Sequence, residues 1–233
     1  MLDSRRRRAL LGKFDRRFGA GLFLRFLTTE PVSRRFGYDR GTPIDRYYIE
    51  NFLRRNAADI SGRALEIGDA SYCRQFGGAQ VTRQEVLHVK AGNPEATIVG
   101  DLSEPGVLPE GGLDCIVLTQ TLHLIYDMKA AVEGIWRGLK PGGGVALVTV
   151  PGISPVAEDE WGTTWYWSLT ALSAKRLFGE VFGPENVEVE TFGNAFSATA
   201  FLQGLAHEEV SKGKLDVVDD GYPVTITIRA RRA

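Results

Sequence analysis

Several features that would assign a protein quickly are scarce in this sequence. Its two cysteines, Cys73 and Cys115, supply neither a disulfide framework nor the spacing of a metal cluster. No apolar run approaches the ~20 residues of a membrane-spanning helix. The apolar stretch near the start is broken by Lys13, Asp15 and Arg16, which argues against a secretory signal. We therefore expect a cytoplasmic protein without a disulfide, a metal centre or a membrane span.

The net charge of −1 conceals a basic segment at one end of the chain. Residues 1–56 contain fourteen Lys and Arg against six Asp and Glu, and the remaining residues are acidic. We expect residues 1–56 to form a basic helical cap or arm, and residues 57–233 to form the main domain. Such an arm suits an anionic or protein partner, or it folds back on its own acidic domain.

The first part of the chain has helical periodicity. Apolar residues recur at threes and fours over residues 1–30. A second amphipathic helix is expected from Ile44 to Arg55, with Pro43 in its first turn and Thr42 as its cap.

From residue 61 onward, short apolar strands alternate with helical stretches, which is typical of a parallel sheet covered on both faces. Two late segments, 187–192 and 223–229, alternate with period two, and residues 195–210 between them are predicted to be helical. The expected fold is α/β: a Rossmann-like, mostly parallel seven-stranded sheet with an antiparallel last strand pair and an N-terminal helical cap. The other five strands are predicted at 63–68, 79–87, 96–101, 113–120 and 144–151.

Carboxylates follow three of the first four predicted strands. Glu66 and Asp69 stand at the end of the first strand, Glu85 at the end of the second and Asp101 at the end of the third. Open parallel sheets bind ligands at the carboxyl ends of their strands. Because a carboxylate can accept hydrogen bonds from both hydroxyls of a ribose, this pattern favours a nucleoside ligand.

Five motifs in this region occur in a characteristic order. They are L-E-I-G, V-T-R-Q-E, I-V-G-D-L, L-P-E-G-G-L-D-C-I-V-L-T-Q-T-L-H and L-K-P-G-G-G-V-A-L-V-T-V-P. With them, residues 61–151 resemble a class I S-adenosylmethionine-dependent methyltransferase. The segments G-T-P-I-D-R-Y-Y-I-E, W-G-T-T-W and F-G-N through A-H-E-E extend the resemblance to a bacterial group associated with glycan biosynthesis.

The resemblance implies S-adenosylmethionine as cofactor and S-adenosylhomocysteine as product. It implies that Glu85 holds the ribose and that Asp101 and Leu102 hold the adenine. The remaining implied cofactor contacts are Glu66 and Gly68 at the methionine end, Asp69 and Tyr72 in the loop, and Thr119 and Gln120 beside the sulfonium.

The loop after the first strand departs from the wider family. Asp69 and Ser71 stand where further glycines are usual, although Gly68 is kept. Asp is one of the better non-glycine residues for a left-handed turn, and Ser is small. We expect a rebuilt, working loop in which Tyr72 replaces lost contact.

Methylation of a hydroxyl usually requires a general base, because the proton must leave the oxygen. His123 follows the fourth strand and is the first candidate. Asp127 and the acidic cluster 158–160 are alternatives. The register of the helix expected at Leu122–Leu124 could instead turn His123 outward.

Segments outside the sheet are expected to close the acceptor pocket. Arg46 and Tyr47 lie on one helix, and the stretch W-G-T-T-W-Y-W supplies Trp161, Trp165 and Trp167. Aromatic faces stack on sugar rings and apolar ligands, and an arginine can hold a carboxylate or another anion.

The expected function is O-methylation of a sugar, a glycan intermediate or another small molecule. A natural-product O-methyltransferase, and a catalytically weak or inactive partner of another enzyme, remain alternatives. A nicotinamide oxidoreductase is disfavoured because Gly68 is followed by no glycine until Gly77. Nucleic acid is not an expected substrate, because Thr119–Leu122 lacks the Pro-Pro-aromatic turn of base-methylating relatives.

Overall fold

The structure is a computed structural model that describes residues 29–233. The helices expected in residues 1–28, and with them most of the basic arm, lie outside the described residues. The helix expected at 44–55 is confirmed as α3 (Ile44–Arg55). Its predicted cap is wrong: Pro43 takes the N-cap position, and the Thr42 hydroxyl instead donates a hydrogen bond of 2.7 Å to Glu208.

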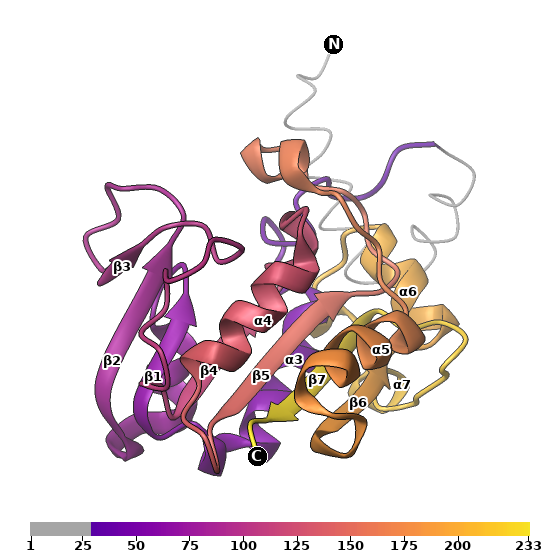
Figure 1. The fold of residues 1–233 in the computed structure, drawn as a ribbon. Coiled ribbons are helices and arrows are strands. Elements are labelled where there is room, and N and C mark those ends of the chain that lie inside the picture. Colours follow the sequence, from indigo (N-terminus) through magenta and orange to yellow (C-terminus); the bar gives the residue numbers. More distant parts are fainter. Residues whose placement is uncertain (1–28) are drawn as a thin grey trace.

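A seven-stranded sheet forms the centre of the molecule (Figure 1). Its strand order is β3-β2-β1-β4-β5-β7-β6, and only β7 runs antiparallel to its neighbours β5 and β6. This arrangement confirms the predicted Rossmann-like sheet with an antiparallel last strand pair. The strands are β1 (Gly62–Ile67), β2 (Val81–His88), β3 (Ile98–Val99), β4 (Cys115–Thr119), β5 (Val145–Pro151), β6 (Val187–Phe192) and β7 (Thr225–Arg231).

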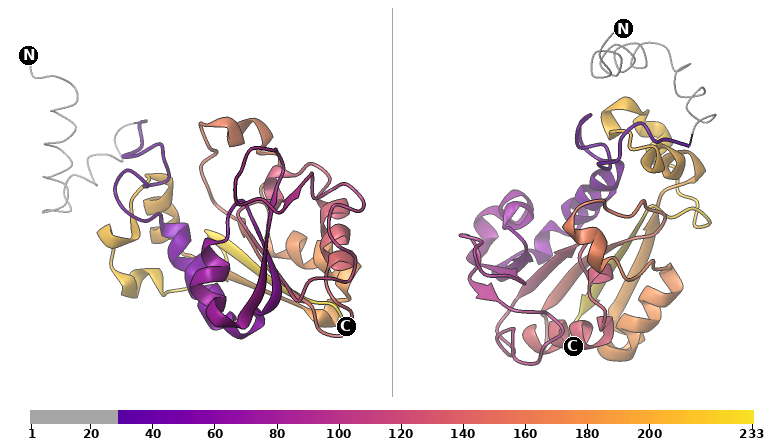
Figure 2. Two further views of the ribbon diagram at one scale, coloured as in Figure 1. Left: turned by 90° about the vertical axis from the view of Figure 1, so that its left-hand side faces the viewer. Right: turned by 90° about the horizontal axis from the view of Figure 1, so that it is seen from above.

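Helices cover both faces of the sheet, as its apolar strands require (Figure 2). On one face, α4 (Met128–Gly138) and α5 (Ala171–Phe182) bury Ile135 and Phe178 against the strands. On the other face, α3 packs Phe52 and Leu53 against Val117 of β4. The apolar residues of β4 and β5 are therefore buried from both sides.

The described part of the N-terminal cap shares its core with the C-terminal helices. Ile44 and Tyr48 of α3 pack against Phe201 of α6 (Ala195–Leu202) and Leu215 of α7 (Lys212–Leu215). Since α3 also packs on the sheet, the core is continuous across residue 56. The division into a cap of 1–56 and a domain of 57–233 stays a prediction.

One predicted helix is shorter than expected. The sequence pattern predicts a helix over 195–210, but α6 ends at Leu202. Gly204 has φ +68°, a conformation that ends the helix, and the chain resumes with a short 3-10 turn at His207–Glu209.

Candidate functional site

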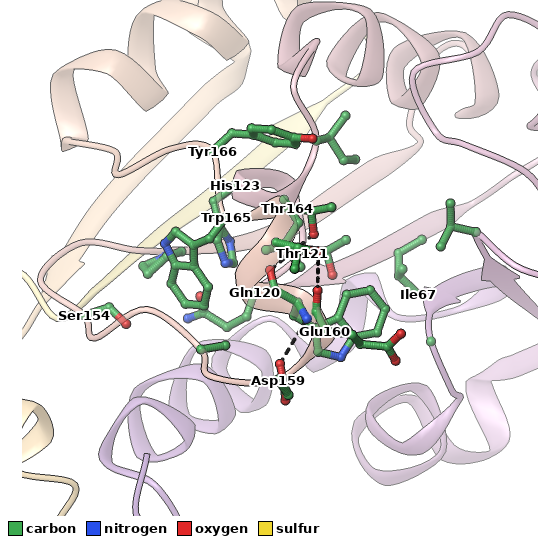
Figure 3. A pocket seen from close by; sticks show the side chains of 18 of the residues that line it. Ile67, Gln120, Thr121, His123, Ser154, Asp159, Glu160, Thr164, Trp165 and Tyr166 are labelled. Atoms are coloured by element: carbon green, nitrogen blue, oxygen red, sulfur yellow. Dashed lines mark hydrogen bonds between the residues drawn. The ribbon is translucent and has the colours of Figure 1, made fainter. Parts of the chain in front are cut away.

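A cleft of about 1190 Å³ opens at the carboxyl edge of the parallel strands. Its floor comes from the ends of β1 to β5, which is where open α/β sheets bind ligands. Its walls and roof come from residues 34–38, from the start of α3 and from residues 154–166. The segment 154–166 is called the lid (Figure 3).

Gly68, directly after β1, borders this cleft. Its φ is +89°, and a Cβ at this position would meet no atom within 4 Å. Glycine is therefore required here by the backbone conformation, and the space beside it is open. A ligand in the cleft can therefore approach the backbone closely at Gly68.

The rebuilt loop after Gly68 is held by two carboxylates. Asp69 accepts a hydrogen bond of 2.7 Å from the Ser71 N–H. The buried Glu66 accepts hydrogen bonds from the Tyr72 and Cys73 N–H groups at 3.1 and 2.8 Å. Burial raises the pKa of Glu66 to about 7, and these two bonds oppose the rise. Neither Glu66 nor Asp69 lines the cleft, so both shape the loop from behind.

Tyr72 also lies behind the cleft, where it supports an arginine that lines it. Arg46 donates hydrogen bonds of 3.0 Å to the hydroxyls of Tyr72 and Tyr38. Arg46, Tyr38 and Asp45 line the cleft, but Tyr72 does not. Burial raises the pKa of Tyr72 to about 12, so the phenol stays neutral as a partner of the guanidinium.

The prediction that Glu85 stands at the carboxyl end of the second strand is wrong. β2 continues to His88, so Glu85 lies inside the strand, opposite Leu65 of β1. Its buried Oε1 atom forms ion pairs of 2.8 Å with both Arg63 and Arg83. Burial alone would raise the pKa of Glu85, but hydrogen bonds from Thr97 and Arg63 and the guanidinium charges lower it. Glu85 does not line the cleft.

Asp101 and Leu102 lie where the sequence places them. Both follow β3 and line the cleft, with Leu102 almost fully buried. Asp101 Oδ1 accepts hydrogen bonds from the Ser103 N–H and hydroxyl at 2.8 and 2.7 Å. The carboxylate is therefore fixed in orientation at the cleft wall.

Thr119 ends β4 and Gln120 follows it, but only Gln120 reaches the cleft. Gln120 has φ +46°, which is rare for a residue with a side chain and indicates backbone strain. Its buried Nε2 has no hydrogen-bond partner within residues 29–233. Such an unsatisfied donor is costly unless a ligand or water completes it.

His123 is buried at 1% exposure and lines the same cleft. It lies in a single 3-10 turn, Leu122–Leu124, so the helix expected here does not form and the imidazole points inward. The described residues offer no hydrogen-bond partner to either ring nitrogen. Burial lowers the pKa of His123 to about 4, which leaves the ring neutral at neutral pH.

Of the predicted aromatic residues, two enter the cleft. Trp165 lies beside His123, with ring centroids 4.3 Å apart (Figure 3). Trp161, also in the lid, lines the cleft. Trp167 stays outside and donates its indole N–H to the carbonyl of Ile125 at 3.1 Å. Tyr47 also stays outside, because its hydroxyl bonds to Asp216.

Sequence reasoning missed Phe36, whose ring stacks on Trp165 with centroids 6.2 Å apart and planes 10° from parallel. Phe36 has φ +55°, so in residues 29–233 the two non-glycine residues with positive φ, Phe36 and Gln120, both line the cleft. Nothing in the sequence signals this strain. Other lining residues that the sequence did not single out include Arg35, Lys90, Ser103 and Tyr126.

Within residues 29–233, no cluster of three or more His, Cys, Asp or Glu could hold a metal ion. Across the same range, no helix has the length and apolar character needed to cross a membrane.

Known proteins support the fold. Residues 57–147 match the family model described as a methyltransferase domain. A S-adenosylmethionine-dependent methyltransferase from Archaeoglobus fulgidus has 13% identity and a TM-score of 0.52 over 80% of this chain and 94% of its own. Another S-adenosylmethionine-dependent methyltransferase, from Mesorhizobium loti, has 14% identity and a TM-score of 0.51 over 81% of this chain and 98% of its own. Phosphoethanolamine N-methyltransferase 2 from Haemonchus contortus, in complex with S-adenosyl-L-methionine, has 14% identity and a TM-score of 0.51, over 95% of this chain and 60% of its own.

No curated protein matches the sequence. The sequence identities to these solved structures are low, so the structural similarity shows the fold and does not identify the substrate. The resemblance to a glycan-associated bacterial group stays a prediction. The chain has the fold of S-adenosylmethionine-dependent methyltransferases, and its residues 57–147 match the methyltransferase-domain family.

Proposed function

We propose that this protein is an S-adenosylmethionine-dependent methyltransferase that methylates oxygen on a sugar, a glycan intermediate or another small molecule. The observation that carries the proposal is the cleft at the carboxyl edge of a methyltransferase-type sheet. Its volume of about 1190 Å³ exceeds the ~300–1,000 Å³ of common single-ligand pockets. The cleft therefore has room for a cofactor and an acceptor together.

The residues on the sheet side fit a nucleoside cofactor. Gly68 leaves open space beside the backbone, Asp101 offers a fixed carboxylate, and Gln120 offers an unsatisfied amide donor. In this proposal Asp101 and Leu102 hold the adenine, while Gly68 and Gln120 border the methionine end. The bound cofactor supplies an electrophilic methyl group, and S-adenosylhomocysteine is the product.

The residues on the lid side fit the acceptor. Phe36 and Trp165 form a stacked aromatic wall that suits a sugar ring or an apolar ring. Beside them, the neutral His123 has a lone pair free to accept the proton of an acceptor hydroxyl.

One observation favours a second candidate, a catalytically weak or inactive partner of another enzyme. The carboxylate expected to hold the ribose is engaged by Arg63 and Arg83 inside β2. A site that has lost this contact would bind the cofactor less tightly. A natural-product acceptor is compatible with the same aromatic wall as a sugar.

The proposal is tested by incubating the protein with S-adenosylmethionine and panels of sugars, nucleotide sugars and phenols, and measuring S-adenosylhomocysteine formation. Acceptor-dependent product that is lost in His123→Gln supports the proposal. Trp167→Leu serves as a control variant, because Trp167 directly follows the lid but lies outside the cleft. Cofactor binding without turnover on any acceptor would favour the inactive partner.

A further inference from the structure

The carboxyl end of β2 lacks an acidic side chain. The last three residues of the strand and the five that follow, residues 86–93, contain no Asp or Glu. Glu95, the next acid along the chain, is paired with Arg74 at 3.0 Å, and Glu85 is engaged inside the strand. A nucleoside on this edge presents two neighbouring ribose hydroxyls, and a carboxylate is the side chain that accepts from both. The floor of the cleft does not provide one at β2.

The lid brings a carboxylate to this place. Glu160 lines the cleft, and its Oε2 lies 3.2 Å from Nζ of Lys90, which follows β2. Its other oxygen, Oε1, accepts no hydrogen bond from any of the described residues. Glu160 therefore stands over the end of β2 with acceptor capacity to spare.

The lid is built to hold this position. Asp159 caps the 3-10 turn Glu160–Thr164 by accepting a hydrogen bond of 3.0 Å from the Trp161 N–H. A Cβ at Gly162 would lie 2.1 Å from the carbonyl oxygen of Ala157, so the turn closes only with glycine. This compact turn fixes the backbone of Glu160 and thereby the origin of its side chain.

The ion pair itself adds little to stability. Both side chains are about two-thirds exposed, and such surface pairs contribute little to the free energy of unfolding. The pair orients Glu160 and leaves one carboxylate oxygen available as an acceptor, because Lys90 contacts only the other oxygen. A ligand can therefore use Glu160 while Lys90 balances its charge.

We propose that Glu160 recognises the two ribose hydroxyls of the nucleoside cofactor, in place of an acid at the end of β2. The inference rests on the proposed function, since it concerns the cofactor of that site. It makes the lid part of the cofactor site as well as the acceptor site.

The test is a calorimetric titration of wild type and Glu160→Gln with S-adenosylhomocysteine and with its 2′,3′-dideoxy analogue, which lacks both hydroxyls. Wild type is expected to bind the analogue 10- to 100-fold more weakly than S-adenosylhomocysteine. Glu160→Gln is expected to lose at least tenfold in affinity for S-adenosylhomocysteine and little or nothing further for the analogue. This pattern would show that the carboxylate and the hydroxyls act as one contact.

Glu95→Gln is the matched control, because Glu95 also comes after β2 and pairs with a basic residue, Arg74, but does not line the cleft. It should keep the full discrimination between the two ligands. Equal discrimination in Glu160→Gln and wild type, or no discrimination in wild type, would overturn the inference and leave the proposed function standing. Absence of S-adenosylhomocysteine binding by wild type would overturn both.

Discussion

His123 lies edge-on against Trp165, with 4.3 Å between ring centroids, and both of its nitrogens lack a partner among the described residues. If His123 takes the proton from the hydroxyl that is methylated, His123→Gln should lower kcat by about 10²–10⁴-fold, the usual contribution of a general base. Its affinity for S-adenosylhomocysteine should stay within about twofold of wild type. The two quantities are measured by steady-state kinetics and calorimetry. Equal kcat in both proteins would remove His123 from the mechanism.

The buried imidazole also predicts a pH dependence of stability. The pKa of His123 is lowered to about 4, so between pH 6.5 and 4 the unfolded chain binds a proton that the folded chain does not. This contribution to stability therefore falls as the pH drops through that window, by up to about 3 kcal/mol. Glu66, with a pKa raised to about 7, acts in the opposite sense, and its contribution falls as the pH rises from 4.5 to 7.

Comparison of wild type with His123→Gln isolates the first effect, because both proteins contain Glu66. The variant should gain stability relative to wild type as the pH falls from 6.5 to 4. Urea unfolding at several pH values between 4 and 7.5 measures the difference. A difference that stays constant across this range would show that His123 is protonated equally easily in the folded and unfolded chains.

Gly68 should be sensitive to any added side chain. Gly68→Ala places a methyl group in the cleft and strains a backbone at φ +89°, at a cost of ~1–3 kcal/mol. Gly78→Ala is a close control, because Gly78 also has positive φ and open space but lies outside the cleft. Both variants should lose stability in thermal unfolding. Only Gly68→Ala should also bind S-adenosylhomocysteine more weakly, and equal binding by the two would exclude a cofactor beside Gly68.

Substitutions at Asp101 and at Glu85 should have different effects, the first on cofactor affinity and the second on the free energy of unfolding. Asp101→Ala should weaken S-adenosylhomocysteine binding by ~1–3 kcal/mol, the scale for hydrogen bonds to a charged group. Glu85→Gln should leave the affinity within about twofold but lower the free energy of unfolding, because Arg63 and Arg83 lose their shared partner. Calorimetry and urea unfolding measure the two effects. Weaker cofactor binding in Glu85→Gln would contradict the placement of Glu85 outside the cleft.

The sheet was predictable because its signals are local. Continuous apolar strands separated by helical stretches specify a covered parallel sheet, and the period-two alternation at 187–192 and 223–229 marks the antiparallel pair. The position of Glu85 within β2 was less predictable, because its sequence context resembles that of an acid at a strand end. Only the packing of Arg63 and Arg83 around it shows that a carboxylate is tolerated inside the strand.

The site was predictable where a residue follows directly from a strand end, as with Gly68, Asp101 and Gln120. It was not predictable where distant segments meet. Phe36 reaches Trp165 only through the fold, and its left-handed backbone has no signature in the sequence. Similarly, the contact of Glu160 with the end of β2 depends on the path of the lid.

The central claim is that the cleft over the strand ends binds S-adenosylmethionine. The most direct measurement is a calorimetric titration of the wild-type protein with S-adenosylmethionine and S-adenosylhomocysteine. We predict one site of micromolar affinity for at least one of the two ligands. Absence of binding up to millimolar concentrations would contradict the claim and leave a methyltransferase fold that serves another role.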